Sequence, residues 1–161
     1  MDQVGEALEA QGIPHYLVDI GGEVRAKGVN AKGIPWRLGI NTPQEDAAIT
    51  DFLAVIALDN LSMATSGNYR NFYEVDGIKY AHTINPKTGY PEKSKLLSAT
   101  VIAKDCMMAD GYATAFMTMG LEKAFALATT QKDIHAYFLY LNEGGNMEER
   151  YTENIKPFIV E

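Results

Sequence analysis

The pattern of apolar and polar positions predicts a helix, a long series of strands, two more helices and a final pair of strands. Residues 2–11 have a helical period that ends at Gly12. The apolar side of this amphipathic helix carries Val4, Ala7 and Leu8.

The segments after this helix are short and apolar, and turn residues separate them, which is typical of strands. Ser66 to Tyr69 are small or polar, and we expect them to form a loop. The Asp76-Gly77 pair is a strong hairpin signal between two short strands. The other strands expected here are residues 15–20, which we read as buried, 23–28, 36–40, 51–59 and 61–65.

The second half of the chain has clearer boundaries. Residues 95–104 predict a strand, and Asp105 is a suitable N-cap for a helix over 106–119 that ends at Gly120. A short helix at 121–130 and a closing hairpin of 135–142 with 147–152 complete the chain. Strands joined mostly by hairpins, with few helices, indicate an α+β fold: an antiparallel sheet with helices packed on it.

Composition narrows the class of protein. A chain of 161 residues with 47% apolar residues suits one domain with a real core, so we treat 1–161 as one unit. The formal charge of -7 disfavours non-specific binding to the nucleic-acid backbone. Cys106 is the only cysteine, which excludes an intrachain disulfide, and no apolar run approaches the ~20 residues of a membrane span.

Asp110 and Thr114 are the first candidate for chemistry. Residues four apart share one face of a helix, so a carboxylate and a hydroxyl there offer two hard oxygen ligands to Mg²⁺. The helix N-terminus nearby favours phosphate. Spacing alone favours the simpler interpretation, in which Asp110 is a solvated or locally paired acid and Thr114 packs. Gly111 weighs toward a site, because glycine inside a helix costs about 1 kcal/mol and close approach of a ligand would justify it.

The segment YAHTINPKTGYP, residues 80–91, is the second candidate. His82 is open to three interpretations: a general base, a phosphate-binding group or a core histidine. The residues after it fit a plain β-turn, in which Lys87 could face a phosphate.

Two glycine segments form the third candidate: Asp19 to Glu23 and Thr65 to Tyr69. Glycine lets a backbone approach a ligand closely. Neither segment has the spacing of a phosphate loop or a dinucleotide fingerprint, so each is weak alone.

Together these segments resemble one family. The runs VDIGGEVRAKG, PWRLGINTP, TSGNYRNFYEVDGIKYAHTINPKTGYP and ATVIAKDCMMADGYATAFMTMG are similar, in order and spacing, to the consecutive motifs of the ApbE family. That family consists of flavin transferases that act on proteins. The resemblance covers residues 2–142 and implies a T-fold-like ApbE architecture.

The resemblance implies a reaction that spacing could not show. The family cleaves the pyrophosphate of FAD and places FMN on a Thr or Ser of an acceptor flavoprotein subunit, with Mg²⁺ required and AMP released. By matching position, Asp110 and Thr114 would be metal ligands and His82 the catalytic group near the acceptor hydroxyl. The residues implied to line the flavin and pyrophosphate site are Ser66, Gly67, Asn68, Tyr69, Asn85, Pro86, Lys87, Thr88 and Gly89.

Two features depart from the family pattern. Asn85 stands where the family usually has Asp, which excludes carboxylate chemistry there but keeps the turn-capping role. Family members are also substantially longer, and this chain resembles their C-terminal portion. The resemblance implies an export or lipid-anchor signal upstream. It therefore implies that the full-length protein is a lipoprotein of the cell envelope.

A C-terminal portion allows other behaviour. The rival interpretation is a module that binds FAD or another nucleotide without turnover, and a third is a remnant that binds nothing. The segments HYLVDI, DFLAVIALD and HAYFLYLN are apolar enough that both of their faces should be covered. We therefore expect a homodimer, or another contact that buries these strands.

Overall fold

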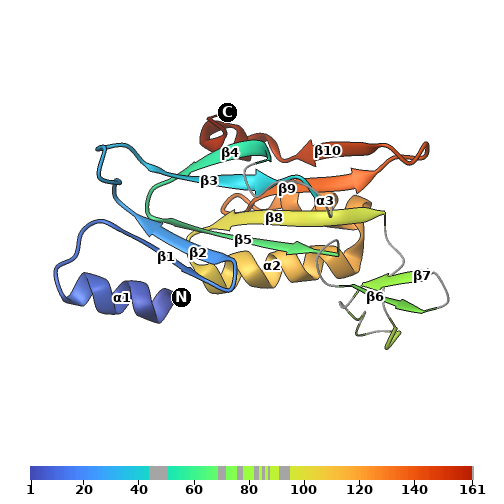
Figure 1. The fold of residues 1–161 in the computed structure, drawn as a ribbon, viewed down its shortest axis with the longest axis horizontal. Helices are drawn as coiled ribbons and strands as arrows, with labels where there is room; N and C mark the ends of the chain where they lie inside the picture. Colours follow the sequence, from blue (N-terminus) through green and yellow to red (C-terminus); the bar gives the residue numbers. More distant parts are fainter. Residues whose placement is uncertain are drawn as a thin grey trace.

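The computed structural model describes residues 1–43, 51–68, 72–75, 78–81, 84, 86, 88–90 and 95–160. Within these ranges, none of the helices is both long and apolar enough to cross a membrane. Figure 1 shows the elements in order. They are α1 (Asp2–Ala10), β1 (Tyr16–Ile20), β2 (Glu23–Lys27), β3 (Trp36–Asn41), β4 (Phe52–Leu58), β5 (Leu61–Gly67), β6 (Phe72–Val75), β7 (Ile78–Ala81), β8 (Leu96–Ala103), α2 (Cys106–Met119), α3 (Leu121–Thr130), β9 (His135–Leu141), β10 (Met147–Tyr151) and a 3₁₀ helix, η1 (Glu153–Phe158).

The centre of the fold is a 6-stranded sheet in the order β1-β2-β5-β8-β9-β10, in which each neighbouring pair is antiparallel. Two further antiparallel pairs, β3 with β4 and β6 with β7, form separate two-stranded ribbons. The α+β prediction with an antiparallel sheet is confirmed. The predicted strands and helices are also present, and among the described residues η1 is the one element that was not predicted.

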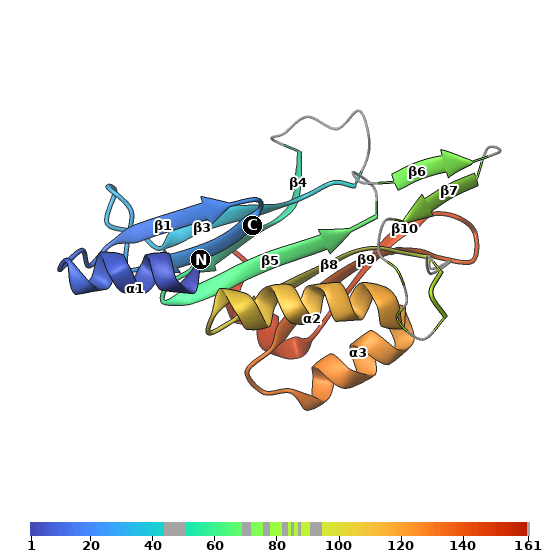
Figure 2. The same ribbon diagram turned by 90° about the horizontal axis from the view of Figure 1, so that it is seen from below.

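Three layers enclose two apolar cores (Figure 2). Helices α2 and α3 cover one face of the sheet, and the β3–β4 ribbon with η1 covers the other. Alternate residues of β8 divide between the two cores: Val101 faces the helices and Ile102 faces the ribbon. The same holds for Phe138 and Leu139 of β9.

The prediction that both faces of three apolar strands are covered holds for one of them. In β9 the central residues are buried on both sides of the sheet. In β4 burial alternates, with Ala54, Ile56 and Leu58 buried and the residues between them partly exposed. The prediction of a buried strand at 15–20 is wrong, because β1 is an edge strand in which only Tyr16 is buried and Ile20 is 55% exposed.

Helix α1 lies beside β1 and uses its polar side for packing (Figure 1). The apolar side does not face the sheet, since Val4 is 40% exposed, and Gly5 is the one buried residue of the helix. A Cβ on Gly5 would come within 2.5 Å of the Arg25 Nε atom and 2.7 Å of the Tyr16 hydroxyl. Glycine there therefore allows α1 to approach β1 and β2 closely.

Helix α2 has the ends that its sequence predicts. The Asp105 carboxylate accepts a hydrogen bond of 2.8 Å from the Met108 N–H, as an N-cap should. Gly120 ends the helix with a φ of 73°, a conformation that L side chains disfavour. Local signals thus fix the position of α2, which carries the candidate site.

Candidate active site

The exposed face of α2 presents the predicted carboxylate and hydroxyl. The opposite face buries Ala109, Ala113 and Phe116 against the sheet, at the spacing of an amphipathic helix. Asp110 and Thr114 are consequently exposed, one turn apart. The prediction that they share an accessible helix face agrees with this arrangement.

Strand β5 places a second hydroxyl against this face. The Ser66 Oγ atom lies 3.0 Å from the Thr114 Oγ1 atom, a hydrogen bond between residues that are 48 positions apart. Ser66 and Gly67 belong to β5, so the predicted loop is wrong for these two residues. Pairing with Ala99 and Ser98 of β8 draws them into the sheet.

Asn68 follows directly after β5, and its N–H donates to the Leu97 carbonyl at 2.9 Å. Its Oδ1 atom is buried and, within the described ranges, has no hydrogen-bond partner. An unpaired buried acceptor is costly, so a ligand that donates a hydrogen bond would stabilise it. This orphan atom fits the implied role of Asn68 in holding a flavin nucleotide.

The two glycine segments meet on the other face of the sheet. There, Gly21 and Gly22 of the β1–β2 turn and Gly67 of β5 help to line a cavity of about 360 Å³. Neither segment was more than a weak signal alone, and only the fold brings them together. Because side chains alternate along a strand, Gly67 borders this cavity while Ser66 points toward α2. The implied flavin-lining residues of β5 are therefore divided between two faces.

The N-terminus of α2 is not free to bind phosphate. The N–H groups of Cys106 and Met107 donate to the Asp2 carboxylate at 2.8 and 3.0 Å, and Met108 donates to Asp105. The prediction that this helix end favours phosphate is wrong, because two carboxylates already satisfy its N–H groups and offset its dipole.

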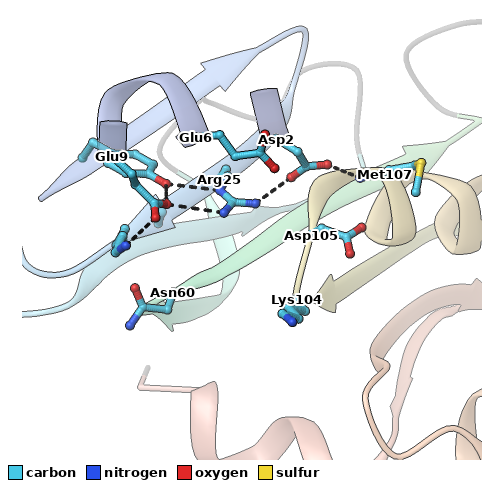
Figure 3. Close-up of a pocket in the computed structure, with 11 residues that line it drawn as sticks. Asp2, Glu6, Glu9, Arg25, Asn60, Lys104, Asp105 and Met107 are labelled. Atoms are coloured by element: carbon cyan, nitrogen blue, oxygen red, sulfur yellow. Dashed lines mark hydrogen bonds and ion pairs between the residues drawn. The ribbon is translucent and has the colours of Figure 1, made fainter. Parts of the chain in front are cut away.

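Asp2 belongs to a network of charged groups around a cavity of about 580 Å³ (Figure 3). Arg25 donates to Asp2 at 2.9 Å and to the Tyr16 hydroxyl at 3.2 Å. Tyr16 and Lys27 each donate to Glu9 at 2.6 Å. The network joins α1, β1, β2 and the start of α2. Its link from Asp2 to α2 spans more than a hundred residues, so no local pattern could have predicted it.

The network sets the charge states of its acids. Burial alone would raise the pKa of Asp2, but the N–H groups of Cys106 and Met107, together with Arg25, lower it below its ordinary value. Hydrogen bonds from Lys27 and Tyr16 lower the pKa of Glu9 to about 2. Burial, reinforced by Asp2, raises the pKa of the Cys106 thiol to about 11, so this cysteine is inert at neutral pH.

Four of the predicted site residues, Tyr69, His82, Asn85 and Lys87, lie outside the described residues.

Pro86, Thr88 and Gly89 of the same predicted loop are described, and all three are exposed. Gly89 has a φ of 75°, and the Tyr90 N–H donates to the Thr88 hydroxyl at 3.3 Å. A glycine with positive φ beside a hydroxyl-to-backbone bond is typical of a turn, as the sequence predicted.

The donor set suits a hard cation that completes its coordination elsewhere. The described residues contain no group of three or more His, Cys, Asp or Glu side chains able to hold a metal by themselves. Asp110 and Thr114 offer oxygen only, which matches Mg²⁺, an ion that keeps several waters and takes phosphate oxygens as further ligands. Among the described residues, a Cβ on Gly111 would have no atom within 4 Å, so the helix surface beside Asp110 and Thr114 is open at this position.

Residues 1–138 match the sequence model of the ApbE family. An FAD:protein FMN transferase of Vibrio cholerae serotype O1 is 40% identical over 159 residues, which are 99% of this chain and 46% of that protein. One from Haemophilus influenzae is 42% identical over 147 residues, covering 90% of this chain and 41% of that protein. The chain thus spans less than half the length of these relatives.

Solved structures agree with the fold. The flavin transferase ApbE from Vibrio cholerae superimposes with a TM-score of 0.84 and 39% identity, over 98% of this chain and 48% of that one. The ApbE protein from Thermotoga maritima gives a TM-score of 0.81 at 32% identity, over 99% of this chain and 50% of that one.

Proposed function

Because the chain belongs to the ApbE family, we propose that it forms the metal-binding portion of an enzyme that transfers FMN from FAD to a protein. The acceptor is a Thr or Ser hydroxyl, and AMP is the leaving group. The observation that carries this proposal is the exposed face of α2, which presents Asp110 and Thr114 and where the Thr114 hydroxyl bonds to Ser66 of β5. The names of the relatives support the transfer of FMN from FAD to a protein.

The reaction breaks the phosphoanhydride bond of the FAD pyrophosphate and forms a phosphoester bond to the acceptor. The acceptor oxygen forms a bond to the FMN phosphorus, the bond from that phosphorus to the bridging oxygen breaks, and AMP leaves with the bridging oxygen. The hydroxyl proton must pass to a base, and we assign this role to His82, since histidine titrates near neutral pH. Asn68 would accept a hydrogen bond from the nucleotide through its unpaired Oδ1 atom.

Asp110 and Thr114 would hold Mg²⁺, whose positive charge would neutralise the pyrophosphate oxygens. The carboxylate and the hydroxyl are accessible and project from one helix face, so they would fix the ion relative to the sheet. The remaining coordination positions would belong to water and to the phosphates.

The test uses the full-length protein with FAD, Mg²⁺ and a peptide that bears an acceptor threonine, and it measures the mass of the peptide. We expect Asp110→Ala to abolish transfer and to leave the fold intact, because Asp110 is exposed. Asp133→Ala removes an exposed acid outside the site and should transfer like the wild type. Normal transfer by Asp110→Ala at limiting Mg²⁺ would contradict the assignment.

His82→Ala separates chemistry from binding in the same assay. It should bind FAD almost as well as the wild type and transfer on the order of 10²-fold more slowly. An equal loss of binding and transfer would instead assign His82 to the binding site.

A second candidate function is the binding of FAD or another nucleotide without turnover. The buried, unpaired Asn68 Oδ1 atom supports it, since a bound nucleotide could donate a hydrogen bond there without any reaction. Flavin fluorescence during titration of this chain with FAD tests that alternative. Binding without any change in peptide mass would identify a nucleotide-binding module.

A further inference from the structure

The hydroxyl of Thr114 is oriented differently from the other threonine hydroxyls in α2 and α3. Those of Thr118, Thr129 and Thr130 donate to the carbonyl oxygen three residues earlier in their own helix, at 2.7, 2.9 and 2.7 Å. That bond is the usual local partner of a threonine inside a helix. Thr114 bonds instead to Ser66 on β5, at 3.0 Å. Its hydroxyl is therefore held by the sheet and not by its own helix.

We propose that Ser66 is a positioning residue, which accepts the Thr114 proton and so leaves the lone pairs of Thr114 Oγ1 for a cation beside Asp110. This inference rests on the proposed function, since it needs the metal site on α2. A neutral hydroxyl binds a cation through a lone pair, and its proton must then point to another acceptor. Ser66 Oγ is the acceptor at hydrogen-bond distance.

The geometry explains why the direction of this bond matters. Without a cation, either hydroxyl of the pair can donate. If Ser66 donated, it would occupy a lone pair of Thr114 Oγ1 and leave the Thr114 proton to find another acceptor. A cation near Asp110 favours the opposite direction, because the oxygen then faces the positive charge and the proton faces Ser66. Partners of this kind, which hold a metal ligand from behind, typically contribute 10–100-fold to metal affinity.

This role differs from a direct contact with the nucleotide, which the family resemblance implies for Ser66. Metal affinity measured without any nucleotide separates the two roles, because a residue that touches only the nucleotide would not change it. A positioning residue also acts solely through Thr114. Once Thr114 has lost its hydroxyl, the loss of Ser66 should have no further effect on the cation.

The experiment is an NMR titration of this chain with Mn²⁺ alone, which reports weak binding through paramagnetic broadening of nearby amide signals. We expect the amides around Asp110 and Thr114 to broaden first in the wild type. Ser66→Ala should need roughly tenfold more Mn²⁺ for the same broadening. Ser66→Thr keeps the hydroxyl and should resemble the wild type. Thr114→Val should bind weakly, and adding Ser66→Ala to it should change nothing.

Each outcome decides between the proposals. If Asp110→Ala abolishes the broadening and Ser66→Ala leaves it unchanged, the role of Ser66 is wrong and the metal site stands. If Ser66→Ala weakens binding as strongly in the Thr114→Val background as in the wild type, Ser66 contacts the cation itself, and the positioning role is overturned. If the amide signals of Asp110→Ala broaden at the same Mn²⁺ concentration as those of the wild type, Asp110 does not bind the cation. The metal site is then wrong, and both proposals fail with it. Unchanged signals from the core in each spectrum exclude misfolding as the cause.

Discussion

The first turn of α2 and its exposed middle carry the same kinds of group but use them in opposite ways. At the first turn, Asp2 and Asp105 accept hydrogen bonds from three successive backbone N–H groups, and Arg25 pairs with Asp2. In the middle, Asp110 is exposed, and the Thr114 hydroxyl bonds to Ser66 on strand β5. A carboxylate whose oxygens accept hydrogen bonds from the protein stabilises the fold. An accessible carboxylate remains available to a ligand.

This contrast also explains why the helix end is a poor phosphate site. A helix N-terminus attracts anions because its N–H groups are unpaired and its dipole is positive there. In α2 the carboxylates of Asp2 and Asp105, from two distant parts of the chain, accept hydrogen bonds from these N–H groups and offset the dipole. A phosphate group would have to displace Asp2 and would meet its negative charge. Under the proposed function, phosphate would therefore be attracted by a cation and not by the helix end.

The largest effect on stability should come from breaking the first turn. We expect Asp2→Ala to lower the free energy of unfolding by about 2 kcal/mol, because two N–H groups and Arg25 lose a charged partner together. Urea unfolding followed by circular dichroism measures this. Asp105→Ala removes one capping bond and should cost about 1 kcal/mol.

The matched control for these variants is Asp110→Ala, which removes a carboxylate from the same helix. It should change the free energy of unfolding by less than about 0.5 kcal/mol, as is usual for exposed positions. Equal costs for Asp2→Ala and Asp110→Ala would show that the two regions do not differ in the way described.

The same contrast separates what the sequence predicts from what it does not. Strand β8 and helix α2 follow from local signals, namely a continuous apolar run, the Asp105 cap and Gly120. The shared face of Asp110 and Thr114 follows from helical periodicity alone. These features depend on residues within a few positions of one another, and such spacing is visible in a sequence.

The contacts that complete the site are not local. Small and polar residues suggested a loop at Ser66, and only its pairing with Ala99 of β8 shows that it belongs to a strand. Its contact with Thr114 spans 48 positions, and that of Asp2 with Cys106 spans 104. Helix α1 shows the same limit, because its polar side packs through the charged network of Asp2, Glu9 and Arg25 while Val4 stays exposed. Hydrophobic periodicity finds the apolar side of a helix, but not the side that faces the protein.

A smaller effect of opposite sign should come from Gly111. Replacing it with Ala should stabilise the chain by about 0.5–1 kcal/mol, because Ala is the better helix former and the added Cβ meets no atom within 4 Å. The same methyl group would occupy the space beside Asp110 and Thr114. In the full-length protein we therefore expect Gly111→Ala to unfold at higher urea concentration and to transfer FMN more slowly. A variant that is more stable and fully active would show that no ligand approaches the helix there.

The smallest effect should come from the partly exposed pair of Glu9 and Lys27 in the charged network, and it should depend on pH. Glu9 has its pKa lowered to about 2 by Lys27 and Tyr16, so its charge stabilises the folded state above the pKa of the unfolded chain, near 4.3. That contribution is lost as the pH falls through the folded pKa, that is, between about pH 5 and pH 2. Glu9→Gln should be less stable than the wild type at pH 7, and the difference in urea midpoint should shrink toward zero near pH 2. Glu6→Gln, at an exposed position on the same helix, should follow the wild type throughout. If the difference in urea midpoint between Glu9→Gln and the wild type stays constant from pH 7 to pH 2, Glu9 acts by packing. Its ion pair with Lys27 would then contribute nothing to the stability of the fold.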